Sequence, residues 1–158
     1  MTTTSKKTRM PVLFVGHGSP MNIVLDNGYT RSLKELGKRL PRPKAILVVS
    51  AHWLTRGTFI TCTEQHEQIY DFYGFPEELY RVRYAAPGSP ALGNRVTAAG
   101  KGSPFTCSSE WGLDHASWAV LVHLYPDADI PVLELSLDMT RREREHEKLA
   151  RELAPLRD

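Results

Sequence analysis

Short continuous apolar runs alternate with amphipathic segments along this chain, and this alternation limits the fold more than any other feature. The clearest strand is residues 45–50 (Ala-Ile-Leu-Val-Val-Ser), and the continuous apolar run 11–16, closed by Gly16, predicts a buried parallel strand. Residues 29–40 place Leu33, Leu36 and Leu40 on one helical face, with charged residues opposite. Strands that alternate with helices predict an α/β layer fold with a mainly parallel sheet.

The same patterns place the other elements within one domain, which a length of 158 residues fits. Residues 64–88 are rich in Tyr, Phe, Gly and Pro and predict an ordered but irregular excursion. We expect further strands at 58–63 and 131–137, a loop or weak strand at 100–110, and helices at 90–99, 115–125 and from a capping box at Thr140 and Glu143 onward.

The composition excludes several classes of protein. A net charge of +2, from 20 basic and 18 acidic residues, gives no electrostatic footprint for nucleic acid. No apolar run reaches the roughly 20 residues needed to cross a bilayer, and residues 1–15 do not have the pattern of a signal peptide. Cys62 and Cys107 lie outside any CxxC motif and are expected to be reduced. We therefore expect a cytoplasmic protein without nucleic-acid or membrane partners.

Two histidines follow predicted strands at equivalent positions. His17 comes directly after the run 11–16, and His52 lies just beyond the run 45–50. If helix 29–40 makes a right-handed crossover, the two strands are parallel neighbours about 4.8 Å apart. Both imidazoles could then bind one metal at about 2.1 Å each, with their nitrogens about 3–4 Å apart. The alternative is that each histidine is a strand-end residue satisfied by a backbone hydrogen bond.

A third histidine, His115, begins a predicted helix between Trp111 and Trp118. A helix N-terminus disfavours a positive charge, so this imidazole is expected to be neutral and able to take up a proton. The alternative is a histidine packed between the two tryptophans. His66 and His146 lie in polar runs and are expected to be solvated, and His123 is expected to be a satisfied, partly buried side chain.

At these residues the sequence resembles the class III, LigB-type extradiol ring-cleavage dioxygenases, in particular the 4,5-DOPA extradiol dioxygenase group. The likeness covers nearly the whole chain. The matching segments are residues 13–21 (Leu-Phe-Val-Gly-His-Gly-Ser-Pro-Met), 41–53, 71–76 (Asp-Phe-Tyr-Gly-Phe-Pro), 84–90 and 111–115 (Trp-Gly-Leu-Asp-His).

The resemblance implies a three-layer α/β fold and specific site chemistry. It assigns His17 and His52 as metal ligands and His115 as an acid/base residue in the active site. The implied cofactor is non-haem Fe(II), with Zn(II) possible in the same site, and the implied substrates are a catechol-type aromatic and O2. The rings of Phe72, Tyr73 and Phe75 are expected to wall the substrate side of the site. The alternative is that they pack as a satellite cluster under a long loop.

The family's chain is longer, and it continues past the segment corresponding to residues 153–158 into a strand and further histidine motifs. Residues 1–158 are therefore expected to be the N-terminal part of a single catalytic domain, with a sheet incomplete at its C-terminal side. We expect impaired catalysis and self-association through an exposed sheet edge. Two other functions stay open from the sequence: a non-catalytic metal-binding remnant, and a metal-dependent hydrolase on the same scaffold.

Overall fold

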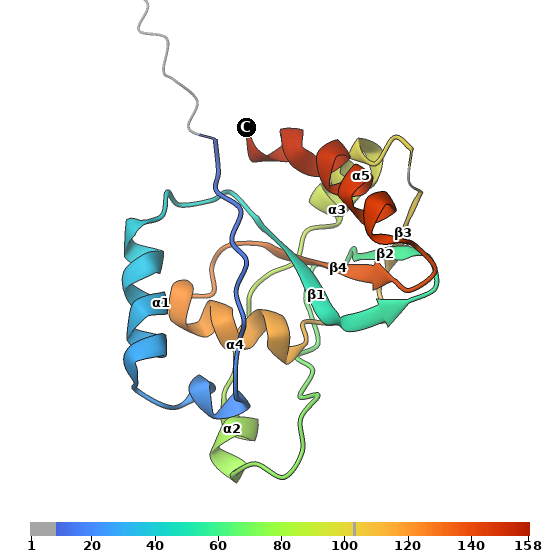
Figure 1. Ribbon diagram of the computed structural model, residues 1–158. Helices are drawn as coiled ribbons and strands as arrows, with labels where there is room; N and C mark the ends of the chain where they lie inside the picture. The colour runs from blue at the N-terminus through green and yellow to red at the C-terminus, as the bar shows by residue number, and fades with distance from the viewer. Residues whose placement is uncertain (1–8, 103) are drawn as a thin grey trace, which may run out of the picture.

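A computed structural model describes residues 9–102 and 104–158, which form a four-stranded sheet covered by helices on both faces (Figure 1). The predicted α/β fold is thus confirmed. The elements are, in chain order, η1 (Pro20–Ile23), α1 (Gly28–Arg39), β1 (Ile46–Thr55), β2 (Thr58–Thr61), α2 (Glu77–Arg81), α3 (Pro90–Ala99), β3 (Phe105–Ser108), α4 (His115–Leu124), β4 (Val132–Asp138), α5 (Glu143–Leu153) and η2 (Ala154–Arg157).

The sheet has the strand order β1-β4-β2-β3 and is mainly parallel. β1 pairs with β4 in parallel, β2 pairs with β3 in parallel, and β2 and β4 are antiparallel. The register between β1 and β4 shifts between Val49 and Leu54, so β1 is irregular in its middle. β4 is buried along nearly its whole length, including its polar residues, as befits a central strand.

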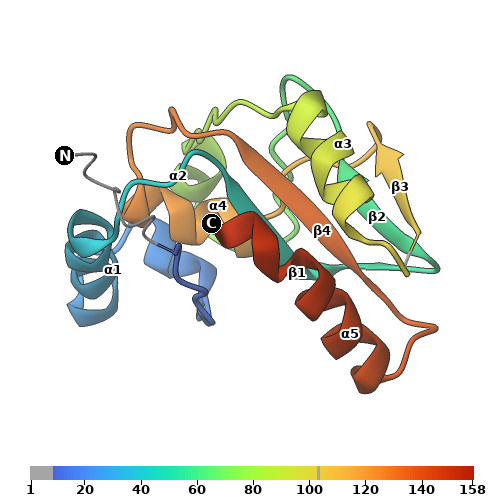
Figure 2. The ribbon, with the colours of Figure 1, turned by 90° about the horizontal axis from the view of Figure 1, so that it is seen from above.

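The two faces of the sheet carry separate cores, because successive side chains of a strand point to opposite faces. Val132 on β4 packs with α1 and α4 in one cluster, which includes Leu33 and Trp118. Leu133 and Leu135 pack in the other cluster with residues of α3 and α5, including Leu149. In Figure 1 the strands lie between α4 on one side and α3 and α5 on the other, and Figure 2, seen from above, has α3 and α5 toward the viewer. None of the helices in the described ranges is long and apolar enough to cross a membrane.

Local hydrogen bonds set the starts of the helices. Asn27 caps α1 by accepting from the Thr30 amide, and Thr30 in turn accepts from the Asn27 amide. The capping box expected at Thr140 and Glu143 is wrong. Thr140 instead binds Asp138 at the end of β4, and α5 starts later, where Glu145 accepts from the Arg142 amide.

Residues 11–16 are not a strand, contrary to the sequence prediction. They are extended, but no ladder pairs them with another described segment, and the neighbour of β1 is β4. Val12 is 72% exposed and the Phe14 side chain is fully exposed, while Val15 packs against the core. An apolar run predicts burial but does not specify the strand that would pair with it. The expectation that His17 and His52 lie on neighbouring strands is therefore wrong.

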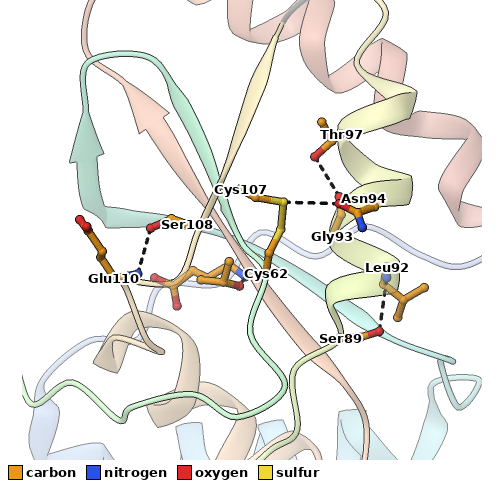
Figure 3. Close-up of a disulfide and its surroundings, with 11 residues drawn as sticks. Cys62, Ser89, Leu92, Gly93, Asn94, Thr97, Cys107, Ser108 and Glu110 are labelled. Atoms are coloured by element: carbon orange, nitrogen blue, oxygen red, sulfur yellow. Dashed lines mark hydrogen bonds between the residues drawn. A yellow bond between two sulfur atoms is a disulfide. The ribbon is translucent and has the colours of Figure 1, made fainter.

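The two cysteines form a disulfide, which corrects the expectation that they are reduced (Figure 3). The parallel pairing of β2 with β3 brings Cys62, just after β2, beside Cys107, with a Cα–Cα distance of 5.4 Å. A separation of 45 residues hides this contact in the sequence. Helix α3 approaches closely at Gly93, where an added Cβ would lie 2.5 Å from the Cys62 sulfur, so a larger residue would not fit without movement.

We expect the Cys62→Ser/Cys107→Ser chain to lose about 2–4 kcal/mol of unfolding free energy, because the disulfide restricts the unfolded ensemble by closing a long loop. Urea unfolding without reductant measures the difference, and wild-type protein in excess reductant should approach the variant. Equal midpoints for the wild type and the variant would contradict the pairing, as would alkylation of both thiols in the native, unreduced protein.

Candidate metal centre

Three histidines from separate parts of the chain meet in one cluster. His17 precedes η1, His52 lies on β1, and His115 is the first residue of α4. Their ring centroids are 4.5–5.0 Å apart in all three pairs. The Nε2 atoms of His17 and His52 are 3.2 Å apart. The predicted proximity of His17 and His52 is confirmed, and His115 faces them and is not enclosed between two tryptophans. Their roles as ligands and as an acid/base residue stay predictions.

His52 is positioned by the irregularity of β1. It lies inside the strand, where the register with β4 shifts, and not beyond the strand end as expected. Its amide donates to the Ser50 hydroxyl, which donates to the Asp114 carboxylate. Asp114 also caps α4 by accepting from the Ala116 amide. The side chain that starts α4 therefore also holds the segment that carries His52.

Asp71 joins two of the histidines, and the sequence analysis did not single it out. Its Oδ2 is 2.6 Å from His52 Nδ1 and its Oδ1 is 2.7 Å from His115 Nδ1. Oδ1 also accepts from the His115 amide at 3.0 Å. A carboxylate only accepts, so both Nδ1 atoms carry the proton and both Nε2 atoms keep a lone pair. Asp71 lies in an irregular segment that matches the family pattern, and no periodicity marks it.

The cluster fits a divalent metal. The potential ligand atoms of His17, His52 and His115 all lie within 4.8 Å of one another. Two nitrogens bound to one tetrahedral ion at about 2.1 Å each are about 3.4 Å apart, close to the 3.2 Å between His17 and His52. A carboxylate that orients ligating histidines is a usual partner of such sites. His17 Nδ1 is buried and has no hydrogen-bond partner within the described part of the chain.

The electrostatics favour a neutral His17 imidazole and an ionised Asp71 carboxylate. Burial lowers the pKa of His17 below its ordinary value, and the neighbouring His115 and His52 lower it further. Burial alone would raise the pKa of Asp71, but hydrogen bonds from His115 and His52 hold it well below its ordinary value. Neutral imidazole is the form that binds a metal, so the lowered pKa of His17 favours metal binding at this residue.

We expect His17 to reduce the stability of the metal-free chain as the pH falls from 7.5 to 5. Burial lowers the pKa of His17 below 6.5, so below that pH the unfolded chain binds more protons at this residue than the folded chain does. Glu134, whose pKa burial raises, has the opposite effect in wild type and variant alike, so the test compares wild type with His17→Ala. In urea unfolding, the free energy of unfolding at pH 5 relative to that at pH 7.5 should be lower in wild type than in His17→Ala. An identical pH dependence in the two proteins would contradict this.

The three predicted aromatic residues occupy different environments. Phe72 is buried in the core and its ring packs edge-on against His115, with centroids 5.2 Å apart. Phe75 packs in turn against Phe72. The Tyr73 side chain is 88% exposed. Of the three, Phe72 is thus the one in contact with the histidine cluster.

The other histidines serve the fold. His66 was expected to be solvated, but it is partly buried and its Nε2 lies 2.8 Å from the Val132 carbonyl, so that expectation is wrong. The ring of His146 is likewise partly buried, 3.2 Å from the Asp138 carbonyl. His123 is buried and bonds the Asn22 carbonyl, as expected.

Comparison with known proteins identifies the family. The sequence matches the family described as the catalytic LigB subunit of aromatic ring-opening dioxygenase over residues 10–158, so the chain belongs to this family. It is 55% identical over 152 residues to a protein of Escherichia coli K12 named 4,5-DOPA dioxygenase extradiol, covering 96% of this chain and 56% of that protein. A protein of the same name from Beta vulgaris is 41% identical over 151 residues, covering 92% of this chain and 56% of that protein.

A solved structure supports the same fold. The crystal structure of an uncharacterized Escherichia coli K12 protein superposes with a TM-score of 0.72 at 48% identity, covering 89% of this chain and 52% of that chain. This chain thus spans about half the length of the relatives that it matches.

Proposed function

We propose that the cluster binds Fe(II) and contributes to extradiol cleavage of a catechol-type aromatic by O2, with DOPA as the substrate suggested by the relatives' names. The observation that carries the proposal is the convergence of His17, His52 and His115, two of them oriented by Asp71. Bound Fe(II) would supply the redox chemistry for O2, which Zn(II) in the same site would lack.

In this proposal, each residue has a distinct role. His17 and His52 bind the metal through their Nε2 atoms. Asp71 keeps the proton of His52 on Nδ1, so that Nε2 stays free. His115, buried and held by the same carboxylate, accepts and returns a proton at Nε2, or adds a third ligand. Phe72 packs against His115 and limits its access to water.

Oxygen uptake tests the proposal. The chain is loaded anaerobically with Fe(II), mixed with DOPA and O2, and compared with His17→Ala/His52→Ala and with the Escherichia coli relative. We expect uptake that requires both histidines and is slower than that of the relative, because the resemblance places further site histidines in the part not matched. If a chain with bound Fe(II) consumes no oxygen, the proposed reaction is contradicted.

A second function is metal binding without turnover. The observation in its favour is that this chain spans about half of each relative while the histidine cluster is already assembled. Stoichiometric metal binding that depends on His17 and His52, together with no oxygen uptake, would support it. A cytoplasmic location also stays a prediction, and the disulfide is the observation against it.

We also propose that the chain self-associates through the free edge of β1. β1 ends the sheet, and Val49 and Leu54 on it are each about half exposed. Unpaired edges with apolar side chains favour pairing with another chain. Light scattering should give a mass above one protomer that decreases in Val49→Lys, with Lys34→Glu on exposed α1 as the control. A monomer at about 100 μM would contradict this.

A further inference from the structure

Glu134 lies in the middle of β4, where an ionisable side chain is unexpected. The residues on either side of it are apolar, and the Glu134 side chain is fully buried. It points to the α4 face, because Leu133 and Leu135 pack on the opposite one. A buried carboxyl group is costly unless hydrogen bonds satisfy it, so its partners indicate its role.

Two of the groups that bond the Glu134 carboxyl group lie at the start of α4. Glu134 Oε2 accepts from the Asp114 amide at 3.3 Å and from the Ser117 hydroxyl at 2.8 Å. These residues flank His115, which opens the helix. The Glu134 carboxyl group therefore fixes the helix end on which His115 is carried.

Other contacts connect Glu134 to the residues on both sides of His52 in the sequence. Glu134 Oε1 accepts from Trp111 Nε1 at 2.9 Å, and the Trp111 ring stacks on that of Trp53, the next residue after His52. Before His52, Ser50 donates to the same Asp114 whose amide binds Glu134, and the Ser50 oxygen accepts from the His52 amide. One side chain thus connects the segments that carry His52 and His115.

The protonation of Glu134 agrees with this arrangement. Burial, and then the adjacent Asp114 carboxyl group, raise the pKa of Glu134 well above its ordinary value. A neutral carboxylic acid keeps acceptor lone pairs for Trp111, Ser117 and the Asp114 amide. Asp114 then remains an acceptor for Ser50 and the Ala116 amide.

We propose that Glu134 is a positioning residue for the histidine cluster, holding His52 through Ser50 and Trp53 and holding His115 through Asp114 and Ser117. It does not contact the ligand atoms and acts only through these neighbours. The inference rests on the proposed metal binding by the cluster. A purely structural role in joining α4 to the sheet would affect stability alone.

Four variants separate the two roles. Glu134→Leu removes every polar contact, and Glu134→Gln keeps one donor and one acceptor. Ser50→Ala removes the hydrogen bonds to the His52 amide and to the Asp114 carboxylate and changes little volume. Leu133→Ala, on the same strand but on the opposite face, is the matched control for lost core stability. Two quantities are measured: the Kd for Co(II) at pH 7.5, and the amide NMR shifts of His52 and His115 in metal-free protein.

We expect Glu134→Leu and Ser50→Ala each to weaken Co(II) binding by about tenfold or more, the effect usual for partners of metal ligands. Leu133→Ala should stay within about threefold of wild-type affinity. Glu134→Gln should weaken Co(II) binding less than Glu134→Leu does, because it keeps one of the two acceptor oxygens. The His52 and His115 amides should shift in the first two variants only. If Glu134→Leu does not fold, Ser50→Ala and Glu134→Gln decide the question.

Wild-type affinity in Ser50→Ala, or an equal loss in Leu133→Ala, would overturn the inference. If the wild type binds no Co(II), the proposed function fails, and the amide shifts in metal-free protein then decide the inference on their own. Unchanged His52 and His115 amides in Glu134→Leu and Ser50→Ala would overturn it.

Discussion

Replacing His17 and His52 together by alanine is expected to weaken Co(II) binding by more than about 100-fold, above the range for loss of an outer partner. The two Nε2 atoms are 3.2 Å apart, so both belong to any site formed there. His115 alone cannot fix the geometry of an ion. Isothermal titration at pH 7.5 measures the Kd.

The control for this experiment is His146→Ala. His146 lies on α5, which packs on the opposite face of the sheet from α4, and its ring bonds the Asp138 carbonyl. Its removal deletes one imidazole without changing the cluster, so Co(II) affinity should be unchanged. A double variant that still binds one equivalent of Co(II) with wild-type affinity would show that the ion is held elsewhere.

Asp71→Asn is expected to weaken Co(II) binding by about 10- to 100-fold, although Asp71 is not assigned as a ligand. Asparagine has one acceptor oxygen, whereas Asp71 accepts from His52 and from His115 through different oxygens. One imidazole must then face an N–H donor, which favours the tautomer with its proton on Nε2. That proton blocks the nitrogen that faces the cluster.

Nitrogen NMR of the histidine rings distinguishes this effect from a general loss of structure. In wild type, His52 and His115 should both carry the proton on Nδ1, and in Asp71→Asn at least one should carry it on Nε2. Asp26→Asn provides the control, because Asp26 forms an exposed ion pair with Arg31. Unchanged tautomers and unchanged Co(II) affinity in Asp71→Asn would contradict the orienting role.

Periodicity predicted the regular elements well because their signals are local. The apolar face of α1 and the apolar run at the start of β1 are both read from residues close together in the sequence. The run at residues 11–16 has the same local signal but is not paired in the sheet. Pairing depends on residues distant in the sequence, so hydrophobicity alone could not predict it. The Cys62–Cys107 contact, created by the β2–β3 pairing, was missed for the same reason.

The site was partly predictable, since residue type and position already pointed to three histidines. His17 and His52 were expected together for an incorrect reason: they meet at an irregular strand and a loop, not on two neighbouring strands. Asp71 and Glu134 gave no signal as isolated residues. Their significance depends on which atoms they bond, which only the folded chain defines.

The most direct test of divalent-metal binding by this histidine cluster is X-ray absorption of the Zn(II)-loaded chain. Zn(II) is suitable because it binds imidazole nitrogen at about 2.0–2.1 Å and does not change oxidation state. The account predicts a first shell that contains at least two imidazoles in the wild type and loses their scattering in His17→Ala/His52→Ala. A shell made of oxygen alone, or a spectrum that is the same in the variant, would contradict it.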